Sequence, residues 1–363
     1  MQVFIISLMI TFFIYLIFCM RLYLSYRIRK DQRYQKQLMK HASFKVEIRE
    51  QFDTLRMGDR LSQETIAQTE KCLKSNIYFD LFNEVIEELF LIEEYRPILK
   101  VYVEIYIGFL QRVIKLDKRK GEIEELKLAK LFGYYQMDLP FINQWLLKKL
   151  DKNSMYLKLN VLTSLAQIGN SSIFAKALTS SYKDFELYNN KVLIGIMQQF
   201  SGDYDELNRL LIRNFKEAED DFQLLLIQYF TVVPCPMVEK KLCEILSEGR
   251  DSHKEICLSI IKYFVNHPNI ESKSILLDYL KHNEWEYRVL SAKSLQYFSE
   301  EDVINQLFIA TGDSNWHVRF NSAMALCNFN INQRIKEYIL QSKDYYSRDI
   351  LQYALSLKEK SFQ

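Results

Sequence analysis

Residues 283–298 read NEWEYRVLSAKSLQYF and residues 314–329 read SNWHVRFNSAMALCNF. When the two stretches are aligned at an offset of 31 residues, the positions that match include Trp285 with Trp316, Arg288 with Arg319, Ala292 with Ala323, Leu295 with Leu326 and Phe298 with Phe329. Self-similarity at a fixed offset of this size is typical of helix pairs that stack into an array. The repeat therefore predicts the architecture of the region in which it lies.

The second copy resembles the second helix of a HEAT repeat, in which an Asp in the turn precedes a Val-Arg pair and then small and Leu positions. Here the matching residues are Asp313, Val318-Arg319, Ala323 and Ala325-Leu326. The first copy departs from this pattern, with Tyr287 before Arg288 and Glu284 in the place of the Asp. The resemblance implies that Asp313 and Arg319 are structural and bond to neighbouring repeats. Arg288 belongs to the same structural repeat motif. We expect Trp285 and Trp316 to open their helices and pack in the core between repeats, with a role in recognition as the alternative.

Apolar helix ends recur upstream of the two copies at a similar period. The candidates, each about one repeat after the last, are Ile168, Phe200, Phe230, Phe264, Phe298 and Phe329. Only 9 Gly and 5 Pro interrupt the 363 residues, and 48% of the residues are hydrophobic, which favours a chain that is mostly helical. The predicted fold class is therefore all-α, an alpha-alpha superhelix or HEAT-like solenoid preceded by one transmembrane helix.

The stretch from Val3 to Met20 carries no charged side chain and is rich in Ile, Phe and Leu. At about 1.5 Å per residue it nearly spans a hydrocarbon core of roughly 30 Å, so it is a candidate transmembrane helix. A cleaved signal peptide and a lipoprotein anchor at Cys19 are the alternatives.

Basic residues follow this span, and almost none precede it. Residues 21–49 carry a net charge of +7, against +2 for the whole chain, which leaves −5 for the rest. By the positive-inside rule we expect a single-pass protein of the cell membrane with its N-terminus outside and the solenoid in the cytoplasm. The membrane-proximal residues that set this topology are Arg21, Arg27, Arg29, Lys30 and Arg33. A peripheral anionic-lipid binder acting through residues 21–49 is the alternative.

A search for catalytic motifs finds no phosphate-binding loop, no GxGxxG, no HExxH and no GxSxG. His253 and Cys257 have the spacing of metal ligands on one helix face, and Cys243 lies one helix earlier, but no convincing further ligand accompanies them. The six cysteines form no CxxC pair and indicate reduced thiols in the cytosol. We therefore predict no enzyme activity, no cofactor and no metal. The localised charge argues against a nucleic-acid partner.

These observations divide the chain into a transmembrane anchor (1–24), a basic juxtamembrane linker or helix (25–50), a helical cap or degenerate repeats (51–150), and HEAT-like repeats with a C-terminal capping helix (151–363). The predicted function is a non-enzymatic, membrane-anchored scaffold whose cytoplasmic solenoid binds a protein partner. A membrane enzyme of envelope polysaccharide or cell-surface assembly would suit such a scaffold. The alternative from another class is an enzyme on a HEAT-like scaffold, of the lyase or nucleic-acid-base type, for which no residues can be named.

Overall fold

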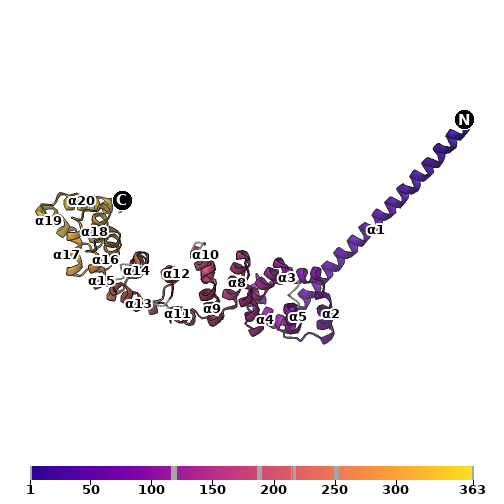
Figure 1. Cartoon of the computed structure of the whole chain (residues 1–363), viewed down its shortest axis with the longest axis horizontal. Helices are drawn as coiled ribbons and strands as arrows, with labels where there is room; N and C mark the ends of the chain where they lie inside the picture. Colours follow the sequence, from indigo (N-terminus) through magenta and orange to yellow (C-terminus); the bar gives the residue numbers. More distant parts are fainter. Residues whose placement is uncertain are drawn as a thin grey trace. The chain divides into compact units, whose positions relative to one another are not determined.

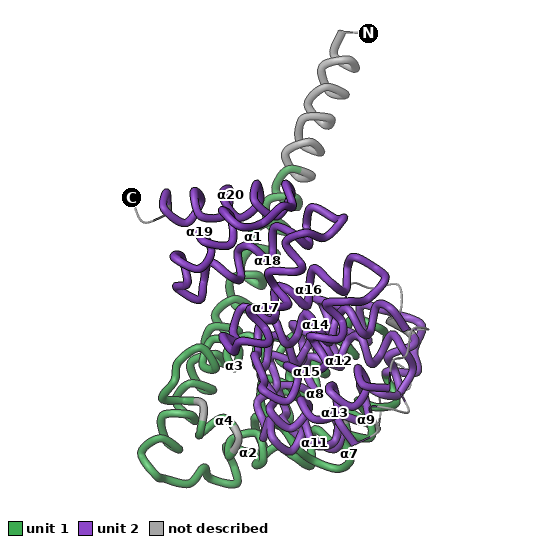
Figure 2. Tube along the Cα trace, turned by 90° about the vertical axis from the view of Figure 1, so that its left-hand side faces the viewer, with its two compact units in different colours: residues 1–149 green, residues 150–363 purple. Residues whose placement is uncertain are grey.

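The structure is a computed structural model that describes residues 2–361 apart from 116–120, 186–189, 214, 216–217 and 249–252. Within its helices, the side chains at 2–19, 76, 96, 100, 113, 115, 184–185 and 361 also lie outside the description. All regular secondary structure in the described part is helical, which agrees with the all-α prediction. The chain forms two compact units, residues 1–149 and 150–363, shown in Figure 2, and the elements of each are labelled in Figure 1.

Unit 1 contains seven α-helices within its described residues. They are α1 (Gln2–Arg56), α2 (Gln63–Leu73), α3 (Asn76–Phe90), α4 (Arg96–Ile105), α5 (Ile107–Lys115), α6 (Glu122–Tyr134) and α7 (Pro140–Lys149). Pro97 and Pro140 stand in the first turns of α4 and α7, where the missing N–H of proline breaks no helical hydrogen bond. The predicted boundary between residues 50 and 51 falls inside α1, so the basic segment and the start of the N-terminal bundle share one helix.

The predicted transmembrane helix, Val3–Met20, lies outside the residues whose side chains are described, except for Met20. No helix in the described part of the chain is long and apolar enough to cross a membrane.

The C-terminal end of α1 packs into unit 1 through Phe44, Ile48 and Phe52, which recur every four residues on one helix face and are each at most 3% exposed. The ring of Phe52 lies 4.0 Å from the ring of Tyr102 in α4, centroid to centroid. Between residues 20 and 40 every residue except Ser25 is exposed. The C-terminal end of α1 therefore lies in the core of unit 1, whereas residues 20–40 of the same helix face solvent.

One buried amide ties three helices of unit 1 together. Gln51 of α1 accepts hydrogen bonds from the hydroxyls of Tyr102 and Tyr106, at 2.8 and 2.9 Å, and donates to the hydroxyl of Thr69 in α2 at 2.9 Å. Gln51, Thr69 and both tyrosines are at most 3% exposed. A buried polar group is tolerated only when it is paired, so the four side chains depend on one another.

Unit 2 contains thirteen α-helices in its described part. They are α8 (Met155–Ile168), α9 (Ser171–Ser181), α10 (Asn190–Met197), α11 (Tyr204–Arg213), α12 (Asp220–Val232), α13 (Pro236–Ser247), α14 (Lys254–Asn266), α15 (Lys273–Tyr279), α16 (Trp285–Leu295), α17 (Glu301–Ala310), α18 (Trp316–Asn328), α19 (Asn332–Gln341) and α20 (Tyr345–Ser361). Each even-numbered helix packs against the next even-numbered one, from α8 to α20. Figure 1 shows the helices of this unit following one another in chain order, as in an array of helix pairs.

The six apolar residues predicted to end the second helices of the pairs all lie within three residues of the ends of α8, α10, α12, α14, α16 and α18. All but Phe329 are buried. The two copies of the repeated stretch form α16 and α18, and they bury the same positions: Ser291 with Ser322, Ala292 with Ala323, and Leu295 with Leu326, all 0% exposed. Small side chains at these positions allow neighbouring second helices to approach closely.

Two glycines about one repeat apart meet in unit 2. Gly169 ends α8 with φ +79°, a left-handed conformation that favours glycine. A Cβ on Gly202 would lie 2.0 Å from the carbonyl oxygen of Gly169, and the backbone N–H of Ser201 donates to the carbonyl of Ala166 at 3.0 Å. These two turns can pack this closely only because both positions lack a side chain.

Candidate partner-binding surface

The repeated arginines hold the turns of the array. Arg288 of α16 reaches forward to Asp313 in the turn before α18, with Nε 2.7 Å from Oδ2 and Nη2 2.9 Å from Oδ1. Both side chains are largely buried, at 12% and 14% exposed. Such a two-pronged pair fixes orientation as well as distance, so α16 and the turn before α18 are locked together.

The same arginines also bond to backbone carbonyls in an equivalent way. Nη1 of Arg288 donates to the carbonyls of His282 and Asn283, both at 2.8 Å. Nη1 of Arg319 donates to the carbonyls of Asp313 and Ser314, at 2.8 and 3.0 Å. The acceptors are separated along the chain by the same offset as the donors. A repeat in sequence is thus a repeat in hydrogen bonding.

Asp313 has opposing influences on its pKa. Burial raises the pKa of this carboxyl, but hydrogen bonds from Arg288 and from the backbone N–H of Asn315, the latter at 2.7 Å, outweigh burial and leave the pKa below its usual range. The charged form of Asp313 is therefore the one that holds the turn. The two arginines differ in a further contact. The guanidinium of Arg288 pairs with Asp313, whereas that of Arg319 lies over the ring of Tyr346, 4.9 Å from the centroid.

The expectation that Trp285 and Trp316 pack in the core between repeats is wrong. Both residues open their helices, but they are 42% and 46% exposed. The buried face of each helix runs through Tyr287 and Val318, two residues further on. Two residues are about 200° around a helix, so a side chain at the first position points away from the array's core.

Around the two tryptophans, rings from α16, α18 and α20 form a nearly continuous row, in which Phe320 is only partly exposed. The ring of Trp285 stacks on His317 at 5.8 Å, and that of Trp316 stacks on Phe320 at 5.0 Å and 8°. Phe320 lies 6.2 Å from Tyr353, which is 47% exposed. We call this set the aromatic surface; its residues are Trp285, Trp316, His317, Phe320, Tyr346 and Tyr353.

Exposed apolar side chains that gather in one contiguous patch mark interaction sites, and tryptophan and tyrosine are enriched at the hot spots of protein interfaces. The ring contacts restrict the motion of the two tryptophan side chains. Sequence reasoning missed Phe320, Tyr346 and Tyr353. A helical projection of 316–329 could have found Phe320, because it lies one turn after Trp316 on the same face.

The membrane-proximal basic residues Arg21, Arg27, Arg29, Lys30 and Arg33 are all exposed on α1. They do not share one face. A basic face instead forms where Arg29, Arg33, Lys36 and Lys40 follow one another at spacings of four, three and four residues. Arg29 and Arg33 thus belong both to the predicted membrane-proximal set and to a four-residue stripe on one face of α1.

Within the described residues no group of three or more His, Cys, Asp or Glu side chains is placed to hold a metal ion. His253 lies instead with Nδ1 2.6 Å from Oδ2 of Asp220. Cys243 is buried, and burial together with nearby Glu271 raises the pKa of its thiol to about 11. A thiol with so high a pKa is a poor nucleophile at neutral pH.

No protein-family model matches this chain, and no curated protein is significantly similar to it.

Proposed function

We propose that this chain is a non-enzymatic, membrane-anchored scaffold whose HEAT-like repeats bind a protein partner through the aromatic surface. The single observation that carries the proposal is the exposure of Trp285 and Trp316 at equivalent positions of two successive repeats. A partner segment lying across α16, α18 and α20 would cover rings from all three helices. Tryptophan and tyrosine account for a large share of binding energy at protein interfaces.

The HEAT-like assignment is supported by Arg288 and Arg319, which make the same pair of carbonyl contacts in two successive repeats. The proposed anchor is Val3–Met20, with the N-terminus outside and the repeats at the cytoplasmic face. An anchor would confine the array to that face and raise its effective concentration toward a membrane-bound partner. The partner we propose is therefore a protein resident at the same membrane.

The test is affinity capture of the full-length chain from its own membranes in mild detergent, with the 31–363 fragment in parallel. We expect a stoichiometric partner with the full-length chain. In the double variant Trp285→Ala, Trp316→Ala, recovery of that partner should fall at least tenfold, since hot-spot aromatics each contribute about 2 kcal/mol or more.

The matched control is Tyr297→Ala, which removes a 53% exposed ring just after α16 and outside the aromatic surface. This variant should recover the partner as the wild type does. If the double variant keeps its partner, the aromatic surface is not the binding site. If the full-length chain is isolated alone and monomeric, the scaffold proposal fails.

A second candidate function, binding of anionic lipid, is favoured by the basic face of α1. Each Lys or Arg near an anionic surface contributes about 1 kcal/mol, so Arg29, Arg33, Lys36 and Lys40 together would give salt-sensitive attachment. A peptide of residues 21–50 should bind vesicles containing phosphatidylserine, and charge removal at the four positions should abolish this. Equal binding to neutral phosphatidylcholine vesicles would exclude the lipid function.

A further inference from the structure

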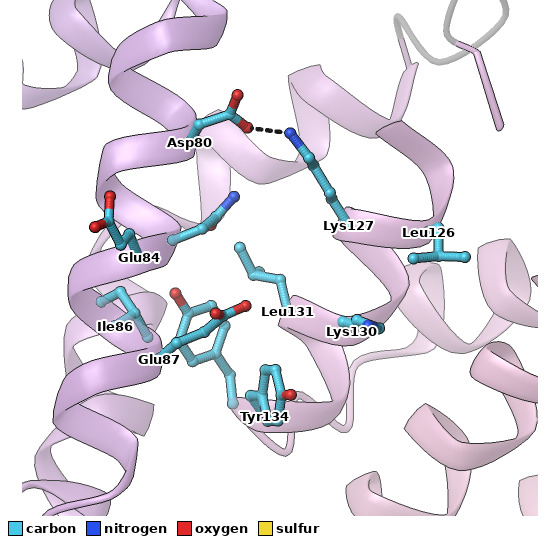
Figure 3. Close-up of a pocket in the computed structure, with 11 residues that line it drawn as sticks. Asp80, Glu84, Ile86, Glu87, Leu126, Lys127, Lys130, Leu131 and Tyr134 are labelled. Atoms are coloured by element: carbon cyan, nitrogen blue, oxygen red, sulfur yellow. Dashed lines mark hydrogen bonds and ion pairs between the residues drawn. The ribbon is translucent and has the colours of Figure 1, made fainter. Parts of the chain in front are cut away.

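A pocket lies in unit 1 between α3 and α6, and Figure 3 shows the side chains that line it. Asp80 of α3 and Lys127 of α6 pair with each other at 2.7 Å, so each neutralises the other's charge. Ile86 and Leu131 in its lining are 2% and 4% exposed and offer a ligand almost no surface. The pocket therefore shows no ligand chemistry, in contrast to the aromatic surface of unit 2.

Exposed rings repeat from helix to helix at the aromatic surface. The first residues of α16, α18 and α20 are Trp285, Trp316 and Tyr345, and all three are exposed. Tyr345 contacts Tyr346 of the aromatic surface, with 6.1 Å between ring centroids. His317 contacts both tryptophans, at 5.8 Å from Trp285 and 5.2 Å from Trp316, so the two indoles are at most about 11 Å apart. Three successive second helices thus present a ring at the same position.

The spacing of these rings matches the period of one kind of extended peptide. α16 packs against α18, and α18 packs against α20. The axes of packed helices lie about 8–10 Å apart. A polyproline II helix has three residues per turn and rises about 3.1 Å per residue, so it presents the same face about every 9 Å. A β-strand presents the same face about every 6.6 Å, which is too short to meet a ring on each helix.

The chemistry of the surface also suits a polyproline II helix. Such a helix makes no internal hydrogen bonds, so its carbonyl groups are free to accept from the indole N–H groups of Trp285 and Trp316. The carbonyl groups of an α-helix are instead bonded within the helix.

Two other modes of peptide recognition lack what they need here. Acidic and phosphorylated segments are bound by clusters of arginines, but Arg288 and Arg319 are held by backbone carbonyls of their own turns. An added strand needs a sheet edge, and the regular structure in the described ranges is entirely helical. Proline-rich segments bind to surfaces lined by aromatic rings, which is what α16, α18 and α20 present.

We propose that the segment bound by the aromatic surface is proline-rich and lies across α16, α18 and α20 as a polyproline II helix, an inference that rests on the proposed partner-binding function. Prolines three residues apart pack on Trp285, on Trp316 and on Tyr346, and carbonyl groups between them accept from the indole N–H groups. From α16 to α20 the segment crosses two helix spacings, about 16–20 Å, which takes about six residues. Because proline-rich chains favour this conformation before binding, little entropy is lost on docking.

The test is titration of the full chain in detergent with a polyproline peptide of about ten residues, followed by tryptophan fluorescence. Trp145, the third tryptophan of the chain, is buried, so a change in emission reports on Trp285 and Trp316. We expect a saturable blue shift as the two indoles are covered. A peptide of about four prolines is long enough for only two of the helices and should bind at least tenfold more weakly.

Two control peptides of the same length separate the polyproline II conformation from general stickiness. A glycine–serine peptide is flexible and carries no rings, and an alanine-rich peptide forms an α-helix. Neither should bind. The inference is overturned when the polyproline peptide does not bind, or when either control peptide binds as tightly.

Single variants locate the peptide on the surface. Trp285→Ala and Trp316→Ala should each weaken binding of the ten-residue peptide at least tenfold. Both side chains are exposed, so the variants should fold as the wild type does. Each variant loses a fluorophore, so binding is measured by the anisotropy of a labelled peptide. Tyr297→Ala should bind unchanged, and wild-type binding by both tryptophan variants would overturn the inference.

The proline-rich inference and the partner-binding function fail in different ways. When the polyproline peptide does not bind, but the captured membrane partner is lost from the double variant Trp285→Ala, Trp316→Ala, the inference is wrong and the partner-binding function stands. When no partner is captured at all, the partner-binding function fails whatever the peptide does. When the polyproline peptide displaces the captured partner from the full-length chain, both are supported.

Discussion

Unit 1 and unit 2 are both helical but are held together in different ways. In unit 1 the central polar contacts occur once: Gln51 alone serves Thr69, Tyr102 and Tyr106. In unit 2 Arg288 and Arg319 make the same contacts in successive repeats, and the same small residues are buried at both positions. Stability in a repeat array is approximately a sum of neighbouring terms, so losing one contact weakens one repeat. The Gln51 contacts of unit 1 have no second copy, so losing them should weaken the whole unit.

The largest effect is expected from Gln51→Met in unit 1. Methionine fills the space but accepts no hydrogen bond from the buried hydroxyls of Tyr102 and Tyr106, so unfolding free energy should fall by about 3–5 kcal/mol. Hydrogen exchange should speed up throughout α2, α3 and α4 together. The control Gln35→Met, on the exposed part of α1, should change stability by less than about 0.5 kcal/mol. Faster hydrogen exchange in only one of these helices would contradict the view of unit 1 as one cooperative cluster.

Gly202→Ala should damage unit 2 locally. The added Cβ would collide with the carbonyl oxygen of Gly169, and the turns must separate at a cost of about 2–3 kcal/mol. Hydrogen exchange should increase in α8 to α11 but stay at wild-type rates in α16 to α20. Gly195→Ala has nothing within 4 Å of its new Cβ, and alanine in a helix should stabilise α10 by up to about 1 kcal/mol. Faster hydrogen exchange throughout unit 2 after Gly202→Ala would contradict the view that losing one contact weakens only one part of the array.

Asp313→Asn should remove a pH-dependent link between two repeats. Because the folded-state pKa of Asp313 is below its unfolded value of about 3.9, its charge stabilises the fold fully above that pH and loses this effect as pH falls through the folded pKa. At pH 7 the variant should be about 1–2 kcal/mol less stable in urea denaturation. The difference from wild type should shrink below about pH 4. A difference that is constant from pH 7 to pH 2.5 would exclude this role for the carboxylate.

The smallest effects are expected from Ser291→Ala and Ser322→Ala. Both hydroxyls are buried without a hydrogen-bond partner in the described structure, so each alanine should raise stability by about 0.5–1 kcal/mol. Because the two positions are equivalent in the repeat, thermal unfolding should give the same gain for both. Clearly unequal gains would show that the two repeats are not energetically equivalent.

Residues close together in the chain carried most of what could be predicted. Apolar periodicity and the constant offset between the two repeated stretches predicted where the second helices of unit 2 end and matched Arg288 with Arg319. The resemblance to a HEAT repeat is what implied a structural role for Asp313. The predicted boundary at residues 150 and 151 lies one residue from the division between the units. In unit 1, a break at Tyr106 separates α4 from α5, and Gly108 stands two residues beyond it.

The sequence by itself determined the helical class and the repeat, because both depend on spacings that fit within a few turns of one helix. Only the tertiary structure decided that Trp285 and Trp316 face outward, since that depends on which neighbouring helices cover each side. The same holds for Gln51, whose partners lie 18 to 55 residues away. Contacts between distant segments follow from how whole faces pack, and no local pattern records them.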